Sequence, residues 1–141
     1  MESIIVWYLR MSVIYFVAGA AIGAMMVLFP GTAGYHIPVH THLNLLGFMS
    51  MMIYGVGYHI LPKFSGRTIY SPKIMKIQFW FANAGLIGIA ISWPFLNMDH
   101  FVSLFKPMLA ISAASSLIAV FLFAFNILKT IKPVQMPPVS K

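Results

Sequence analysis

The stretch IVWYLRMSVIYFVAGAAIGAMMVLF, from Ile5 to Phe29, decides the fold of this chain. It contains one charged side chain, Arg10, and it ends at Pro30-Gly31. At about 1.5 Å per residue, one helix of this length crosses the ~30 Å hydrocarbon core of a bilayer. Arg10 is expected at an interface, where its long side chain reaches water. The run is too long for the apolar part of a signal peptide, and no small-residue cleavage site precedes Pro30, so a transmembrane helix is favoured.

Three more apolar runs follow, and together the four predict an all-α integral membrane four-helix bundle. The expected spans are about residues 5–29, 39–61, 77–96 and 101–128, in a domain of residues 1–132. Residues 133–141 contain three prolines and are expected to form an exposed C-terminal tail. Of the 141 residues, 60% are hydrophobic and 8% are charged, with mean hydropathy +0.89. A soluble domain of this size has no core large enough to bury so much apolar surface.

Basic residues are distributed unevenly between the predicted connections. Residues 30–38, between the first two spans, contain no Lys or Arg, whereas residues 62–76 carry Lys63, Arg67, Lys73 and Lys76. The positive-inside rule therefore predicts that both termini and the second connection lie in the cytoplasm. The net charge of +7 lies at the ends of apolar runs. That position indicates topology signals and contact with membrane lipids, and it disfavours a nucleic-acid partner.

Aromatic and small residues predict which surfaces meet lipid headgroups and which meet other helices. Gly19 and Gly23 in the first span are four residues apart, which predicts a close contact between helix backbones. Small residues predict the same for the fourth span, at Ala110, Ala113 and Ala114. Aromatic side chains near the predicted span ends are expected to form an interfacial belt. This belt would contain Trp7, Tyr8, Tyr58, Phe79, Trp80 and Trp93.

Few side chains in this sequence can carry chemistry. There is no cysteine, and the two acidic residues, Glu2 and Asp99, stand at the ends of spans. Neither a thiolate-ligated metal nor a pair of carboxylates inside the membrane is therefore expected. The sequence also has no Ser-His-Asp pattern and no glycine-rich phosphate loop. Hydrolytic and phosphoryl-transfer chemistry are disfavoured.

The five histidines are the strongest candidates for a site. His36, His40, His42 and His100 all fall at one predicted membrane face, the outer one. His59 follows His40 by 19 residues, so it lies roughly 28 Å further along the helix, at the opposite face. Imidazole near hydrocarbon is costly unless it is paired or bound to a metal, so the cluster indicates function. One interpretation is an outer-face copper or zinc site formed by the four clustered histidines.

A haem site is the other interpretation, with His40 or His42 as the iron ligand. The two side chains differ by roughly 200° around a helix, so they cannot face one metal together. His40 shares its face with Asn44 and with Gly47, seven residues on, where a glycine leaves room for a flat macrocycle. His42 faces apolar side chains only. The residues alone leave both ligands open, and they also leave open that both are interfacial polar residues without a metal.

The stretch HTHLNLLGF from His40 to Phe48, with GYHILPK from Gly57 to Lys63, resembles part of a known family. It is similar to the second transmembrane helix of subunit I in the haem–copper oxidase and nitric-oxide reductase superfamily. The greatest similarity is to small stand-alone subunit I-like proteins of prokaryotes. The resemblance implies a multi-pass protein of a prokaryotic cytoplasmic membrane. It also implies a haem b whose iron is bound by His40, with His42 as the alternative.

The same family uses further histidines on later helices for its binuclear centre. The third and fourth spans of this chain contain no His-x-x-x-Tyr or His-His group. The chain alone is therefore not expected to be an oxidase or a reductase. The expected function is haem b binding for electron transfer or for binding NO or O2, as a homo-oligomer or within a larger respiratory complex. The alternatives are a non-catalytic accessory subunit of such a complex, or the copper or zinc site.

Overall fold

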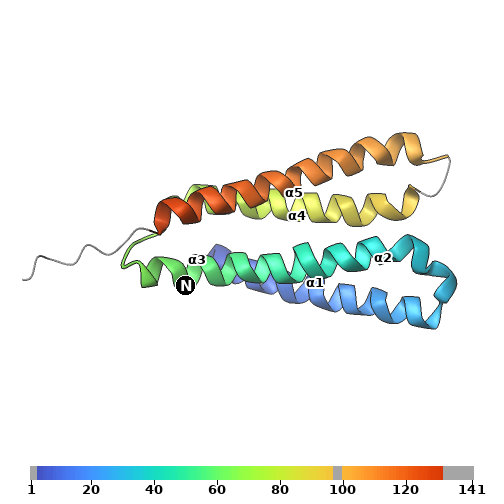
Figure 1. The fold of residues 1–141 in the computed structure, drawn as a ribbon, viewed down its shortest axis with the longest axis horizontal. Helices are drawn as coiled ribbons and strands as arrows, with labels where there is room; N and C mark the ends of the chain where they lie inside the picture. Colours follow the sequence, from blue (N-terminus) through green and yellow to red (C-terminus); the bar gives the residue numbers. More distant parts are fainter. Residues whose placement is uncertain (1–2, 97–99, 132–141) are drawn as a thin grey trace, which may run out of the picture.

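The computed structural model describes residues 3–96 and 100–131, and its regular elements over these ranges are all helices (Figure 1). Four continuous helical stretches are long and apolar enough to cross a membrane: α1 at Ser3–Leu28, a second at Pro30–Phe64, α4 at Pro72–Phe95 and α5 at Val102–Thr130. The predicted all-α membrane architecture with four spans is confirmed. The predicted tail, residues 133–141, lies outside the described residues, as do Glu2 and Asp99.

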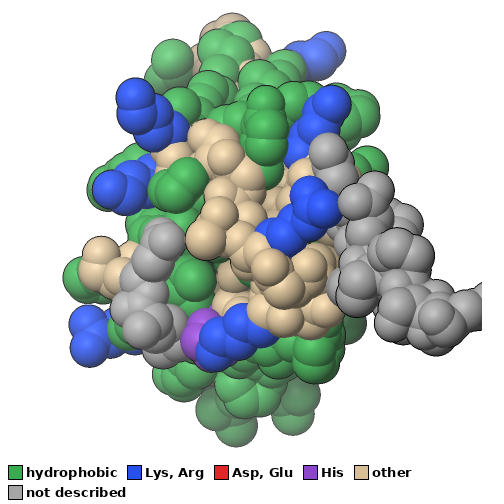
Figure 2. Space-filling model, turned by 90° about the vertical axis from the view of Figure 1, so that its left-hand side faces the viewer, with side chains coloured by type: hydrophobic (Ala, Val, Ile, Leu, Met, Phe, Trp, Pro, Cys, Tyr) green, Lys and Arg blue, Asp and Glu red, His purple; other side chains and the backbone are tan. Residues whose placement is uncertain are grey.

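The four stretches alternate in direction and form two antiparallel pairs (Figure 1). One pair is α1 with the second stretch, and the other is α4 with α5. We call the end with the α3–α4 connection the basic end, because five basic residues lie there: Lys63, Arg67, Lys73, Lys76 and Lys129. Figure 2 shows this end face-on, with Lys and Arg side chains spread across it. The opposite end, which carries His36, His40, His42 and His100, is the histidine end.

The second stretch begins earlier than predicted and is not uniform. A 3-10 turn, η1 at Pro30–Thr32, leads into α2 at Ala33–His42, then the π-helical segment η2 at Leu43–Ser50, then α3 at Met51–Phe64. The prediction of 39–61 left Pro38 outside the helix, because proline usually breaks one. Pro38 instead lies inside α2. Membrane helices tolerate proline, since neighbouring groups satisfy the backbone atoms that it frees.

The limits of the last two spans differ less from the prediction. α4 begins at Pro72 and not at Ile77, because Ser71 caps it: the Ser71 Oγ accepts a hydrogen bond from the Ile74 N–H at 3.3 Å. Proline suits the first position of a helix, where its missing N–H is not needed. α5 covers Val102–Thr130, against the predicted 101–128.

α4 and α5 approach closely through small residues. Gly85 and Gly88 of α4 face Ser112 and Ser116 of α5, and a Cβ at Gly88 would lie 2.9 Å from the Ser112 Cβ. Contacts of this kind hold membrane helices together by packing. The alanines of the fourth span make no such contact within the bundle, because their side chains are exposed: Ala110, Ala113 and Ala114.

Part of the predicted aromatic belt lies in the core instead. Tyr8 is 0% exposed, and its hydroxyl lies 2.9 Å from the Met75 carbonyl. Tyr58 and Phe79 are buried as well. By contrast, Trp80 is 69% exposed, as the belt requires. The buried and the exposed aromatic residues both lie near helix ends. What distinguishes them is the direction in which each side chain points from its helix.

Candidate functional site

The His40 imidazole lies at the contact between α2 and α1. Its Nδ1 is 2.8 Å from the carbonyl oxygen of Gly19. Beside the ring, a Cβ at Gly23 would lie 2.9 Å from the His40 Cε1. Any residue larger than glycine at position 23 would therefore displace the His40 ring. The predicted small-residue pair of the first span therefore does make a close contact. Gly19 supplies a carbonyl to the imidazole, and Gly23 supplies space for it.

The contact with Gly19 determines which tautomer His40 adopts when it is neutral. A carbonyl oxygen only accepts hydrogen bonds, so the His40 Nδ1 carries the hydrogen and the Nε2 keeps its lone pair. Metal-bound histidines commonly donate their other ring N–H to a backbone carbonyl, which orients the ring. In this tautomer, Nε2 is the nitrogen through which His40 would bind a metal.

Asn44 is a further member of this site. Its Nδ2 donates to the His40 carbonyl oxygen at 2.8 Å and lies 3.4 Å from the His40 Nδ1. A Cβ at Gly19 would lie 2.7 Å from the same Asn44 nitrogen. Helical spacing predicts Asn44 on the same face as His40, but it does not predict a role for Asn44. A polar residue four positions from a candidate ligand is the signal that could have identified it.

His42 faces a different helix. Its Nδ1 is 2.7 Å from the Pro38 carbonyl oxygen in its own helix, and its ring packs against Trp93 of α4 with centroids 5.5 Å apart. The two rings thus contact different partners, as their spacing of roughly 200° predicts. The neutral His42 also keeps a lone pair on Nε2, so it stays the alternative ligand. Among the histidines that the structure describes, only His40 has a hydrogen bond to another transmembrane helix.

The remaining histidines lie apart from this contact. The His36 Nδ1 is 2.9 Å from the Thr32 carbonyl oxygen, and His100 is exposed just before α5. His59 is at the basic end, as predicted from its spacing, with its Nε2 3.0 Å from the Lys63 Nζ. Over residues 3–96 and 100–131, no three His, Cys, Asp or Glu side chains are grouped so that they could hold a metal ion. The described part of the chain does not assemble the predicted copper or zinc ligands.

Gly47 packs against two other helices. A Cβ there would lie 2.6 Å from the Tyr15 Cβ of α1 and 3.0 Å from the Leu86 Cδ2 of α4. Tyr15 is itself fixed, because its hydroxyl donates to the Asn83 Oδ1 at 2.6 Å. In this arrangement Gly47 lets three helices meet, and side chains fill the space beside it. Its role in clearing room for a macrocycle stays a prediction.

Comparison with known proteins gives a match to one curated protein. Over 56 residues, this chain is 34% identical to the "Cytochrome c oxidase subunit 1 homolog" of Agrobacterium tumefaciens (strain T37). The match covers 38% of this chain but only 10% of that protein. No family model matches the chain, and no solved structure does. The chain is thus a helical membrane protein that resembles one region of subunit I of cytochrome c oxidase.

Proposed function

We propose that this chain is a membrane haem b protein that transfers electrons or binds a diatomic gas such as NO or O2. The observation that carries the proposal is the His40 imidazole, whose Nδ1 lies 2.8 Å from the Gly19 carbonyl, so that Nε2 is the nitrogen left to bind a metal. The partial match to an oxidase subunit 1 homolog supports the same choice. When bound, haem would supply reversible iron redox chemistry or an open position for a gas.

In this proposal the protein's own residues hold and orient the ligand. Gly19 accepts the Nδ1 hydrogen, Gly23 leaves room for the ring, and Asn44 fixes the backbone of the same turn. His42 turns toward α4, so it does not share a ligand direction with His40. A second axial ligand would come from another copy of the chain or from a larger respiratory complex. The proposed location is a prokaryotic cytoplasmic membrane, with the histidine end outside and the basic end in the cytoplasm.

Haem content of histidine variants tests the proposal. Wild-type protein, expressed with added haem precursor and purified in detergent, should show a Soret band. His40→Ala should lose most of this absorbance at matched folded yield, because it removes the axial ligand. His59→Ala is the matched control and should retain it, since His59 lies at the basic end. Wild-type protein without a Soret band would overturn the proposal. Loss of haem in His42→Ala but not in His40→Ala would assign the ligand to His42.

Spectra of the same samples distinguish electron transfer from gas binding. Spectra of oxidised and reduced protein report whether the iron has one axial ligand or two. A low-spin spectrum with two axial ligands supports electron transfer, because no position is open. A high-spin spectrum that shifts when NO or CO is added supports gas binding.

A second candidate function, as an accessory subunit, is favoured by the surface of α5. α5 packs against α4 and α3 but makes no contact with α1 in the described residues. Its exposed face includes a group of small residues that would suit a further transmembrane helix: Ala110, Ala113 and Ala114. Purification in native lipids distinguishes the two functions. Copurification with larger oxidase or reductase subunits favours the accessory role, and a stable oligomer of this chain alone disfavours it.

A further inference from the structure

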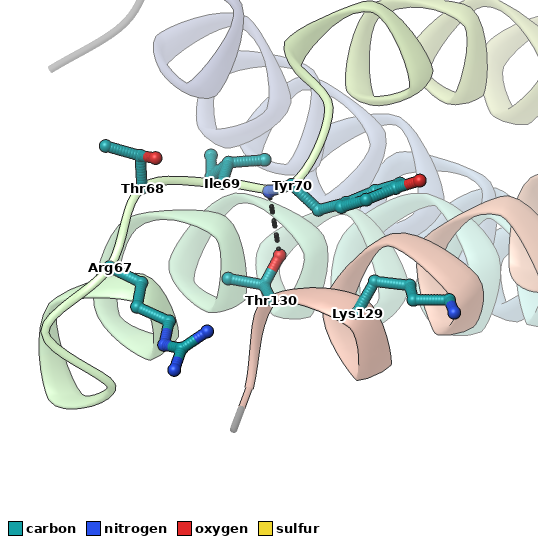
Figure 3. A pocket seen from close by; sticks show the side chains of 6 residues that line it. All are labelled: Arg67, Thr68, Ile69, Tyr70, Lys129 and Thr130. Atoms are coloured by element: carbon teal, nitrogen blue, oxygen red, sulfur yellow. Dashed lines mark hydrogen bonds between the residues drawn. The ribbon is translucent and has the colours of Figure 1, made fainter. Parts of the chain in front are cut away.

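The basic end contains a pocket that is unrelated to the histidines (Figure 3). Its volume is about 430 Å³, and two separate segments line it. The α3–α4 connection contributes four residues and the end of α5 contributes two: Arg67, Thr68, Ile69, Tyr70, Lys129 and Thr130. The pocket lies where the chain leaves two apolar spans, so it is at the depth of lipid headgroups.

Hydrogen bonds from buried side chains fix the α3–α4 connection to α5. The Tyr70 N–H donates to the Thr130 Oγ1 at 3.0 Å, which Figure 3 shows as a dashed line. The Ser71 N–H donates to the Asn126 Oδ1 at 3.0 Å, and the Asn126 Nδ2 donates to the Ser71 carbonyl oxygen at 3.0 Å. Asn126 is 0% exposed and Thr130 is 2% exposed. The wall of the pocket is therefore preformed, which lowers the entropic cost of binding.

Two cations border the pocket without carboxylate partners in the described part of the chain. Arg67 from the connection and Lys129 from α5 lie on either side of Thr130 (Figure 3). No Asp or Glu occurs among residues 3–96 and 100–131. Both side chains are long and exposed, so both can turn toward one anion. Arginine binds phosphate oxygens in a bidentate manner, and lysine adds a second positive charge.

From this geometry we propose that the pocket binds the phosphate group of an anionic molecule. The Arg67 guanidinium and the Lys129 ammonium hold the phosphate. Two sources share this chemistry: the headgroup of an anionic phospholipid, and a soluble phosphate ester. The proposal is independent of haem binding, because the site lies at the opposite end of the bundle from His40.

Lipid retention in a pair of matched double variants tests this site. Full-length protein in detergent is mixed with dioleoylphosphatidylglycerol or with dioleoylphosphatidylcholine, and bound lipid is counted by native mass spectrometry. Wild-type protein should retain more of the anionic lipid. Arg67→Gln/Lys129→Gln should bind it about tenfold more weakly, since it loses the charge-assisted hydrogen bonds to the phosphate oxygens. Lys73→Gln/Lys76→Gln removes the same charge from the same end but does not line the pocket, and should have a much smaller effect.

Soluble phosphate compounds distinguish the two sources. If inorganic phosphate or glycerol 3-phosphate binds the wild type and displaces the anionic lipid, a soluble ester is a ligand of the site. If neither compound competes but the anionic lipid is retained, the ligand is the lipid. Equal losses in the two double variants would overturn the proposal, because they would reflect diffuse surface charge. Equal retention of the two lipids by wild-type protein, with no binding of the soluble compounds, would overturn it too. Size-exclusion chromatography of each variant in detergent checks folding separately.

Discussion

A methyl group at Gly23 would meet the His40 ring at 2.9 Å from Cε1 and 3.1 Å from Nδ1. Gly23→Ala should therefore push the imidazole off the Gly19 carbonyl and lower haem content, since the ligand loses the contact that orients it. Overpacking of this kind typically costs roughly 1–3 kcal/mol, which leaves a bundle folded. Haem per protein is the measurement. Gly34→Ala is the control, because nothing lies within 4 Å of a Cβ there. Equal haem in both variants would mean that the ring position does not depend on Gly23.

Gly47 gives a second prediction at the scale of single residues. Because Tyr15 and Leu86 fill the space beside it, Gly47→Leu should destabilise the haem-free protein by roughly 1–3 kcal/mol. Unfolding in sodium dodecyl sulfate without haem measures the effect, with Gly34→Leu as the exposed control. Unchanged stability of the haem-free protein, together with lost haem, would instead support the macrocycle-clearance role.

The candidate ligand could be proposed from sequence, but its surroundings could not. Two patterns indicated His40: the grouping of histidines at one membrane face and the resemblance of its helix to subunit I. Helical period also showed that Gly19 and Gly23 share a face. The period does not say which helix meets that face, so the pairing of these glycines with His40 and Asn44 required the structure.

Among the elements, the spans were predictable and the internal irregularity was not. Hydropathy locates an apolar run because the bilayer sets its length. It does not respond to a change from α- to π-helical backbone hydrogen bonding, as in η2. A π-helical segment of this length shifts the faces that follow it, and such segments often occur at functional sites.

The α3–α4 connection supports a prediction at this scale. Asn126→Ala removes both hydrogen bonds to Ser71 and leaves the Ser71 N–H without its partner, whereas the Ser71 carbonyl keeps the bond from the Met75 N–H. We expect a loss of about 1–2 kcal/mol and faster proteolysis within residues 65–71. Mass spectrometry of the fragments measures the cleavage rate. The control is Thr41→Ala, whose exposed hydroxyl bonds only to the Ile37 carbonyl in its own helix. Equal cleavage in the two variants would contradict a structural role for Asn126.

For the whole molecule, the distribution of charge predicts how the bundle sits in the membrane. The chain has no native cysteine, so Gly34→Cys and Thr68→Cys each introduce a single thiol at one end. An impermeant maleimide added to intact cells should label the position-34 thiol, at the histidine end. It should label the position-68 thiol, at the basic end, only after lysis, because basic connections stay in the cytoplasm. The reverse pattern would invert the orientation and place His40 near the cytoplasmic face.

The polar contacts that hold the bundle together were not evident from the sequence. Tyr15 binds Asn83, and Tyr8 binds Gln78, each between α1 and α4. In hydrocarbon a polar side chain turns inward to find a partner, and such bonds between helices contribute about 0.6 kcal/mol on average. Composition shows that these residues exist, but the pairing depends on how the two helix pairs dock. The sequence therefore predicts the four helices, but it does not predict how the two helix pairs pack together.

The His40 contact also has a consequence for the order in which the protein is made. Gly19, Gly23, His40 and Asn44 all belong to the first helical hairpin, and α4 and α5 supply none of these contacts. The ribosome makes all four residues before it makes α4. The imidazole can thus be oriented by the first hairpin alone, before α4 and α5 pack against it. If the chain binds haem as proposed, the ligand and the groups that orient it are in place before the second hairpin packs.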